Sequence, residues 1–153
     1  MIIWNDQFAT GSPDIDQQHR MLIFNINHLG WMLTNTNLSR ESCEFLIHLT
    51  NFLEAYAQKH FRFEEACMER YRCPVHERNK QAHAQFLALL SHFKTRCRAE
   101  GFRPQIIQGL HQALASWIQE HILQVDSHLK PCIAAALAPA TLAQKAEVAA
   151  AGA

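Results

Sequence analysis

The sequence is poor in the residues that make tight turns. Glycine and proline supply five residues each of the 153 in the chain, about half of the roughly 12% that they make up together in an average protein. A protein built of many short strands needs a turn between every two of them. The shortage therefore argues against a β-sandwich or a β-barrel.

An excess of charge of either sign is also missing. The 14 basic residues are balanced by 14 acidic ones, and charged residues make up only 18% of the chain. A chain without excess positive charge has no general electrostatic attraction to nucleic acid or to an anionic membrane. Hydrophobic residues, at 48%, are enough to bury the core of one domain of this length.

Targeting signals and paired cysteines are absent as well. The first residues lack the basic start, apolar stretch and small-residue cleavage site of a secretory signal, and no apolar run approaches the roughly 18 residues of a membrane span. We therefore expect a soluble, cytoplasmic protein. An odd number of cysteines without a Cys-x-x-Cys pair argues against a disulfide framework and a zinc ribbon. We expect buried, apolar roles for all five, which are Cys43, Cys67, Cys73, Cys97 and Cys132.

What the sequence does contain is helical periodicity in four long segments. Apolar residues recur at steps of three and four in segments 15–35, 39–70, 74–97 and 104–126. Ser39 is a candidate helix N-cap, and Pro74 and Pro104 are candidate first-turn prolines. Because the connections are short, neighbouring helices should run antiparallel. The sequence thus predicts an all-α, up-down-up-down antiparallel four-helix bundle.

The two ends of the chain differ from this pattern. Residues 1–14 are expected to form an irregular N-terminal arm on a bundle domain that spans 1–132. Segment 133–153 contains eleven alanines and no aromatic residue, and Pro139 interrupts it. A segment of this composition can bury little apolar surface, so we expect an Ala-rich tail or linker, or a weak helix that docks on the bundle or on a partner.

Each predicted helix also places a metal-competent side chain on its apolar face. His60 and Glu64 are four residues apart, as are Asn79 and His83, so each pair lies on one helix face. Buried imidazoles and carboxylates are costly unless they are paired or bind a metal. A mixture of the two without thiolates suits iron or manganese in a helical bundle. The six candidate ligands are His19, His60, Glu64, His83, His121 and Asp126.

These residues resemble the hemerythrins, and more specifically the bacteriohemerythrins, over about residues 1 to 132. The resemblance rests on five features in the family's order: Trp4 with an early Asp, Ile15-Asp16-x-x-His19, His60-Phe61-x-x-Glu64-Glu65, Pro74 followed by His83 and Phe86, and Trp117-Ile118-x-x-His121-Ile122-x-x-x-Asp126. It implies a non-heme diiron protein that binds dioxygen and is not an enzyme.

By the resemblance, His19 and His60 would bind one iron and His83 and His121 the other. Glu64 and Asp126 would bridge the pair together with a solvent-derived oxygen. An apolar oxygen pocket next to the metals would slow the entry of protons. Its candidates are Phe61, Ile118 and Ile122.

The sequence departs from the family at position 79, where Asn79 replaces a seventh ligand, a histidine. We do not expect His76 to substitute, because it lies about 10 Å along the helix from His83 and side chains lean toward the N-terminus. The remaining histidines are expected on the surface or in supporting positions; they are His28, His48, His92, His111 and His128.

With one imidazole fewer, the second iron should be more open and oxidise faster. This shifts the expected role from oxygen storage or transport toward oxygen or redox sensing. The alternatives are a diiron enzyme or sensor that acts on nitric oxide or peroxide, and a helical interaction module without metal. Small anions are possible ligands, manganese or a mixed metal pair remains an alternative, and a signalling partner or electron donor is not identified by any motif.

Overall fold

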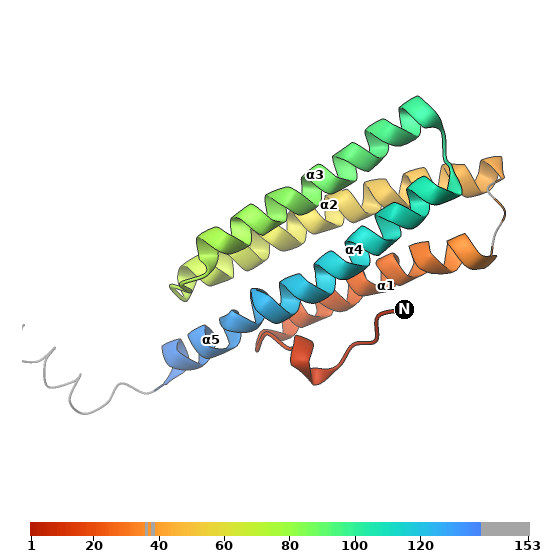
Figure 1. Ribbon diagram of the computed structural model, residues 1–153. Coiled ribbons are helices and arrows are strands. Elements are labelled where there is room, and N and C mark those ends of the chain that lie inside the picture. Colours follow the sequence, from red (N-terminus) through yellow and green to blue (C-terminus); the bar gives the residue numbers. More distant parts are fainter. Residues whose placement is uncertain (36, 38, 139–153) are drawn as a thin grey trace, which may run out of the picture.

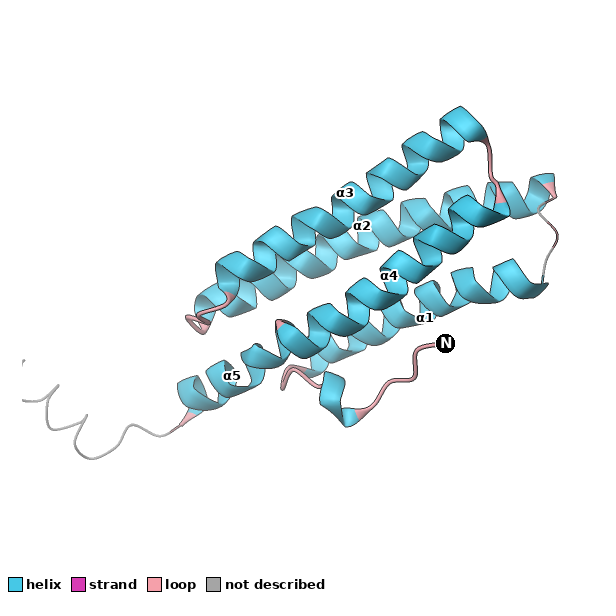
Figure 2. Ribbon diagram, in the orientation of Figure 1, coloured by secondary structure: helices cyan, strands magenta, loops and turns pink. Residues whose placement is uncertain are grey.

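The computed structural model describes residues 1–35, 37 and 39–138, and this part of the chain is helical without any strand. Four long helices dominate it (Figures 1 and 2): α1 (Pro13–Asn35), α2 (Arg40–Arg70), α3 (His76–Glu100) and α4 (Pro104–Gln124). Their bounds agree with the segments expected from the apolar periodicity to within a few residues.

The four helices pack as a closed ring. Each packs against the next in sequence, and α4 packs against α1, while the short connections reverse the chain direction between neighbours (Figure 1). The predicted all-α four-helix bundle is therefore confirmed. None of the described helices has the length and mean hydropathy that crossing a membrane requires.

Local signals at the helix ends account for the turns. The Ser39 hydroxyl accepts a hydrogen bond from the Ser42 amide at 3.3 Å and caps α2, as its sequence position predicts. Gly101 follows α3 with φ of 80°, a conformation that glycine adopts without steric cost. Pro74 lies in the turn before α3 rather than in its first turn, because the helix begins two residues later, at His76.

The apolar faces of the helices fill one long core. It contains a layer of aliphatic and aromatic side chains from all four helices, among them Leu22, Leu53, Phe86 and Leu114, which are fully buried. A second, smaller cluster of Ile15, Met68, Cys73 and Leu129 closes the end of the bundle where α2 turns into α3. The polar residues considered below lie among these apolar layers.

The N-terminal arm is irregular, as expected, apart from the short helix η1 (Asp6–Phe8). It is fastened to α1 at both ends. The backbone of Ile2 exchanges two hydrogen bonds of 2.8 Å with the Asn27 side chain, and both the amide and the hydroxyl of Thr10 donate to the Asp16 carboxylate at 2.8 Å. The arm therefore covers part of α1 instead of extending into solvent.

The chain continues in helical form beyond α4. A short helix η2 (Asp126–His128) is followed by α5 (Leu129–Leu137). The boundary expected between 132 and 133 thus falls inside α5. Pro139 and the rest of the expected tail, from 139 to 153, lie outside the described residues.

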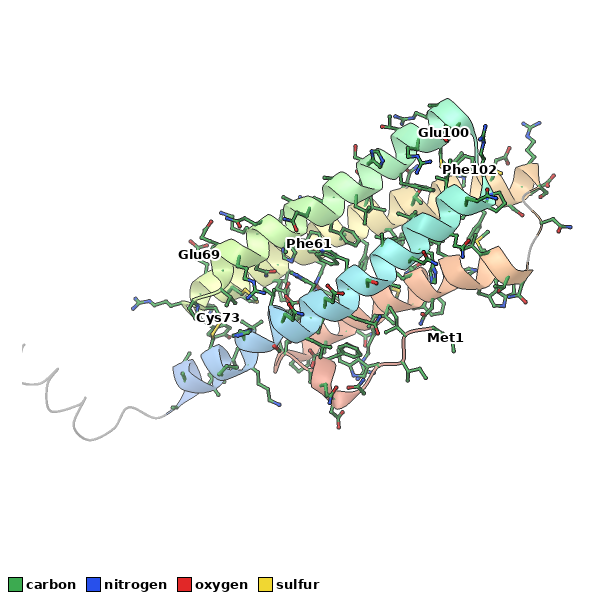
Figure 3. All side chains as sticks on the ribbon, viewed as in Figure 1. Met1, Phe61, Glu69, Cys73, Glu100 and Phe102 are labelled. Carbon is green, nitrogen blue, oxygen red and sulfur yellow. A yellow bond between two sulfur atoms is a disulfide. The ribbon has the colours of Figure 1, made fainter. Side chains whose placement is uncertain are left out.

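The structure corrects the expectation that the cysteines form no disulfide. Cys73, in the turn between α2 and α3, is bonded to Cys132 of α5, with their Cα atoms 5.7 Å apart (Figure 3). Cys97 is a buried free thiol as expected, whereas Cys43 and Cys67 are only half-buried. The disulfide ties α5 to the end of the bundle.

Candidate metal centre

All six candidate ligands meet in the interior of the bundle. They come from four helices and from η2, and each is at most 5% exposed. Two groups of ligand atoms, each within 4.8 Å of one another, share Glu64. The first group is His19, His60 and Glu64, and the second is Glu64, His83, His121 and Asp126.

Glu64 lies at the centre of this arrangement. One carboxylate oxygen is 3.7 Å from Nε2 of His19, and the other is 3.9 Å from Nε2 of His60 and 3.3 Å from Nε2 of His83. A single carboxylate therefore contacts imidazoles from three different helices. This is the position expected of a carboxylate that bridges two metal ions.

Asp126 connects the other two sides of the site. Its two oxygens lie 3.3 Å from Nε2 of His19 and 3.1 Å from Nε2 of His121. Because η2 follows directly after α4, the backbone turns at Val125 and brings Asp126 back toward the interior. Asp126 thus touches a histidine of each group, as Glu64 does.

Most of these inward-facing atoms have no hydrogen-bond partner. The buried side-chain atoms left unpaired in the described structure include Nε2 of three histidines, one oxygen of Glu64 and both oxygens of Asp126. Unpaired buried polar groups are costly, and so many in one place indicate a site for positive ions. Imidazole nitrogens and carboxylate oxygens are suitable ligands for iron, so the residues fit a metal pair.

Two of the histidines are held from outside by a neighbouring helix. Nδ1 of His60 lies 2.8 Å from Oε1 of Gln18, and Nδ1 of His83 lies 2.7 Å from Oε1 of Glu65. Such contacts to the outer nitrogen orient a ligand imidazole and leave Nε2 free for metal. Neither supporting role follows from a sequence pattern, although each of the two residues adjoins a predicted ligand in sequence.

The pKa values of the buried groups reflect the crowding of charges. Burial acts to lower the pKa of His19, but its contacts with Asp126 and the charge of Glu64 outweigh burial and raise it. Burial and the neighbouring histidine His19 lower the pKa of His60 well below its ordinary value. Burial acts to raise the pKa of Asp126, but the neighbouring His121 and His19 outweigh burial and lower it.

Asn79 is fully buried beside the site, where the family has its seventh ligand by the resemblance. Its side-chain nitrogen donates to a Glu64 oxygen at 3.3 Å and to the Met68 sulfur at 3.2 Å. Its side-chain oxygen is buried without a hydrogen-bond partner. Asn79 therefore contacts the central carboxylate through a donor.

Aromatic rings cover two of the histidines. Phe61 stacks on His83 with ring centroids 3.7 Å apart, and Trp117 stacks on His121 at 4.2 Å. The oxygen-pocket candidates Phe61, Ile118 and Ile122 are all buried in the main core. Their role toward oxygen stays a prediction.

The histidines that were expected to have other roles lie outside the two ligand groups. His76 contacts Glu77 at 3.6 Å in the first turn of α3. His28 joins an aromatic cluster with Phe24, Trp31 and Phe45, and His111 packs over Gly30. His48, His92 and His128 are exposed.

A four-helix bundle with four histidines and two carboxylates on its inner faces defines a helical-bundle metal-binding protein. Comparison with known protein families agrees with this assignment as a metal-binding protein. The family described as the hemerythrin HHE cation binding domain matches residues 10–133, and the chain belongs to this family.

Its curated relatives carry the name bacteriohemerythrin. The chain is 30% identical over 137 residues to that of Stenotrophomonas maltophilia (strain R551-3), with 84% of each chain covered. It is 27% identical over 126 residues to that of Clostridium acetobutylicum, covering 82% of this chain and 96% of the relative. For Pseudomonas aeruginosa (strain LESB58) the identity is 28% over 126 residues, covering 82% and 77%.

Proposed function

We propose that this chain binds two iron ions and uses them to bind dioxygen, as a binding protein rather than an enzyme. His19 and His60 would hold one iron, and His83 and His121 the other, while Glu64 and Asp126 would bridge them. The observation that carries the proposal is the set of buried, unpaired nitrogen and oxygen atoms that face one another between the helices. When bound, the iron pair supplies the electrons for reversible oxygen binding.

The side chains around the ligands serve this function by holding positions and excluding water. Gln18 and Glu65 fix the outer nitrogens of His60 and His83. Phe61, Ile118 and Ile122 keep the interior apolar. A dry site limits the access of protons, which favours release of oxygen over oxidation of the iron.

The site has one imidazole fewer than the family has by the resemblance, and this favours sensing over storage. In the half next to Asn79, a buried amide stands in place of an imidazole, and its nitrogen is engaged with Glu64. We therefore assign the second iron one protein ligand fewer than the family's pattern gives it, and a position open to water or small anions. Faster oxidation of the iron would follow, which suits an oxygen or redox sensor.

Metal analysis combined with absorption spectroscopy tests the proposal. After anaerobic reconstitution with ferrous iron, the chain should contain about two iron ions. Exposure to air should produce a new visible absorption that oxygen removal reverses at early times. Iron content well below one per chain would reject the diiron site, and stoichiometric uptake of manganese in preference to iron would reject the metal assignment.

The open second site also favours an alternative ligand, nitric oxide or peroxide, because a small molecule could reach it without displacing a histidine. Turnover of either compound by the iron-loaded chain, lost when His121 is replaced by alanine, would identify an enzyme. Binding without turnover would support the sensor.

A further inference from the structure

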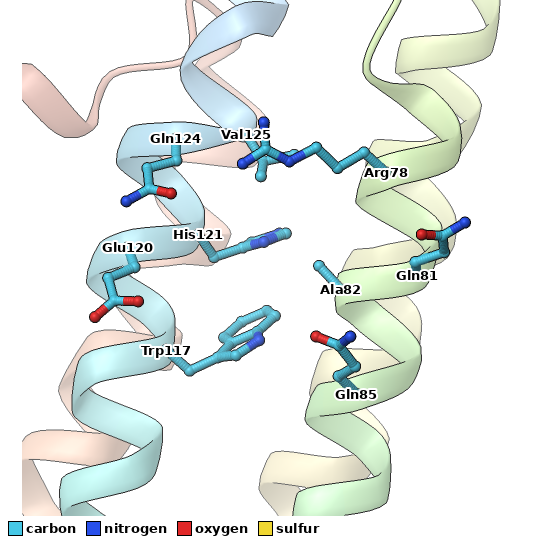
Figure 4. Close-up of a pocket in the computed structure, with 9 residues that line it drawn as sticks. All are labelled: Arg78, Gln81, Ala82, Gln85, Trp117, Glu120, His121, Gln124 and Val125. Atoms are coloured by element: carbon cyan, nitrogen blue, oxygen red, sulfur yellow. The ribbon is translucent and has the colours of Figure 1, made fainter.

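A pocket opens on the surface between α3 and α4, directly over His121 (Figure 4). Its volume is about 290 Å³. Arg78, Gln81 and Gln85 line it from α3, and Trp117 and Gln124 line it from α4. Glu120 also lines the pocket from α4, so the pocket combines one positive charge, one negative charge, three side-chain amides and one aromatic ring next to a candidate metal ligand.

The outer nitrogen of His121 lacks the protein partner that two other candidate ligands have. Nε2 of His121 faces Asp126 at 3.1 Å, so Nδ1 lies on the opposite side of the ring. Gln18 and Glu65 provide acceptors for His60 and His83, but no described residue accepts a hydrogen bond from Nδ1 of His121. His121 lines the pocket, and its Nδ1 is not one of the buried side-chain atoms that lack a hydrogen-bond partner. A molecule bound in the pocket can therefore supply the acceptor for this nitrogen.

Arg78 provides the charge that such an acceptor needs. Its side chain extends from α3 across the pocket toward α4, with the guanidinium near Val125 and above the His121 ring in the view of Figure 4. It forms no ion pair with any described residue within 4.0 Å. Glu120 projects from the side of α4 that faces away from α3, and its carboxylate points away from Arg78 (Figure 4).

We propose that this pocket binds a small carboxylate between Arg78 and His121. The planar guanidinium matches a carboxylate with two parallel hydrogen bonds. A carboxylate oxygen would accept from Nδ1–H of His121, as Glu65 does at His83 in the protein itself. Trp117 stacks on the His121 ring at 4.2 Å and supports it beside the pocket.

A bound carboxylate would also affect the metals, and this second part rests on the proposed diiron function. An acceptor on the outer nitrogen makes the imidazole a stronger electron donor to a metal. The ligand would therefore stabilise the oxidised iron and lower the reduction potential of the site. The protein would then respond to the concentration of the carboxylate as well as to oxygen.

Binding of acetate to the full chain tests the pocket separately from the metals. Calorimetric titrations use a buffer without carboxylate or phosphate and compare the unchanged chain with Arg78→Gln. Arg98→Gln is the matched control, because it removes the same charge from an exposed position of the same helix, 20 residues and about 30 Å away. We expect Arg78→Gln to weaken acetate binding about tenfold or more, because a charged hydrogen-bond partner is lost, and Arg98→Gln to leave it unchanged.

The titrations are run on both the metal-free and the iron-loaded chain. Equal binding by the unchanged chain and Arg78→Gln would overturn the proposal, as would tighter binding of phosphate than of acetate. Acetate binding seen only with iron and insensitive to Arg78→Gln would place the anion on the metal instead. If the chain takes up no iron, the proposed function fails, but the metal-free titration still decides whether the pocket binds carboxylates.

The reduction potential of the iron-loaded chain tests the coupling. Acetate should lower the potential of the unchanged chain, and this shift should disappear in Arg78→Gln. A circular dichroism spectrum matching that of the unchanged chain shows that the variant is folded. A shift that persists in Arg78→Gln would overturn the coupling.

Discussion

The side-chain nitrogen of Asn79 donates a hydrogen bond to the Glu64 carboxylate across the interface of α2 and α3, at 3.3 Å. The same nitrogen contacts the Met68 sulfur at 3.2 Å, so the amide is oriented from two sides. It is therefore placed to hold the central carboxylate of the site. An imidazole at this position would instead offer a nitrogen ligand to a metal.

Replacement of Asn79 by histidine should make the oxygenated state of the iron-loaded chain last longer. The added imidazole would fill the open position of the second iron and reduce access of water, which slows oxidation. Stopped-flow mixing with oxygen, followed by the decay of the visible absorption, measures the lifetime. If the oxygenated state of the unchanged chain already lasts many minutes, Asn79 is not the cause of an open site.

Removal of the Glu65 carboxylate should weaken iron binding. Glu65 is 2.7 Å from Nδ1 of His83, and loss of such an outer partner typically lowers metal affinity about 10- to 100-fold. Competition with a chelator of known affinity measures the change in Glu65→Ala. Glu69→Ala is the control, since Glu69 is exposed one helical turn further along α2. Equal losses in the two variants would show a general charge effect instead of orientation of His83.

The helices and the inner-face ligands could be predicted because periodicity determines which residues share a helix face. His60 and Glu64 are four residues apart and therefore point the same way. The supporting residues could not be found in this manner. Gln18 and Glu65 are each one residue from a predicted ligand, about 100° around the helix, and only the placement of the neighbouring helix shows which imidazole they reach.

The disulfide was missed for a related reason. Five cysteines allow many pairings, and none is favoured by spacing. Cys73 and Cys132 are separated by 59 residues and meet only because α5 continues along the bundle past the turn between α2 and α3. The pocket at Arg78 likewise depends on how α3 and α4 are separated at His121, which no local pattern encodes.

Loss of the disulfide should lower the stability of the fold. A cross-link that closes a loop of 59 residues restricts the unfolded chain, and the expected contribution is about 4 kcal/mol. Urea unfolding of the metal-free Cys132→Ser variant measures it, with Cys43→Ser as a control for a free thiol. A reducing agent should destabilise the unchanged chain and not Cys132→Ser. Equal stability of the unchanged chain and Cys132→Ser under oxidising conditions would show that the disulfide does not form in solution.

Two glycines in helix interiors should respond to alanine in opposite ways. A Cβ atom at Gly30 of α1 would lie 2.4 Å from Nε2 of His111 of α4, whereas a Cβ at Gly109 would meet nothing within 4 Å. We expect Gly30→Ala to destabilise the fold by about 1–3 kcal/mol because the imidazole must move. Gly109→Ala should stabilise it by about 0.5–1 kcal/mol, since alanine favours the helix.

Thermal or urea unfolding measures both glycine variants. The combination Gly30→Ala with His111→Ala should recover most of the loss, because it removes the side chain that the new methyl group meets. A neutral or stabilising Gly30→Ala would mean that α1 and α4 are further apart in solution, or that His111 moves at little cost.

Iron uptake should release a proton in a pH range set by His19. The pKa of His19 is raised above 6.5 in the metal-free chain: burial lowers it, but Asp126 and Glu64 raise it more. Between 6.5 and that raised value, His19 carries a proton that an ordinary histidine would have lost, and a metal must displace it. His60, with a lowered pKa, and Asp126, already ionised, contribute none in this range.

Proton release is measured with a weakly buffered pH indicator during anaerobic addition of ferrous iron. Just above pH 6.5 we expect roughly half a proton or more per chain from this group, falling toward zero as the pH rises through the raised pKa of His19. Apparent iron affinity should increase over the same range, since competition by protons fades. Release that stays constant across this range would show that His19 is neutral before iron binds, and that its contacts with Asp126 and Glu64 do not hold a charge in the metal-free protein.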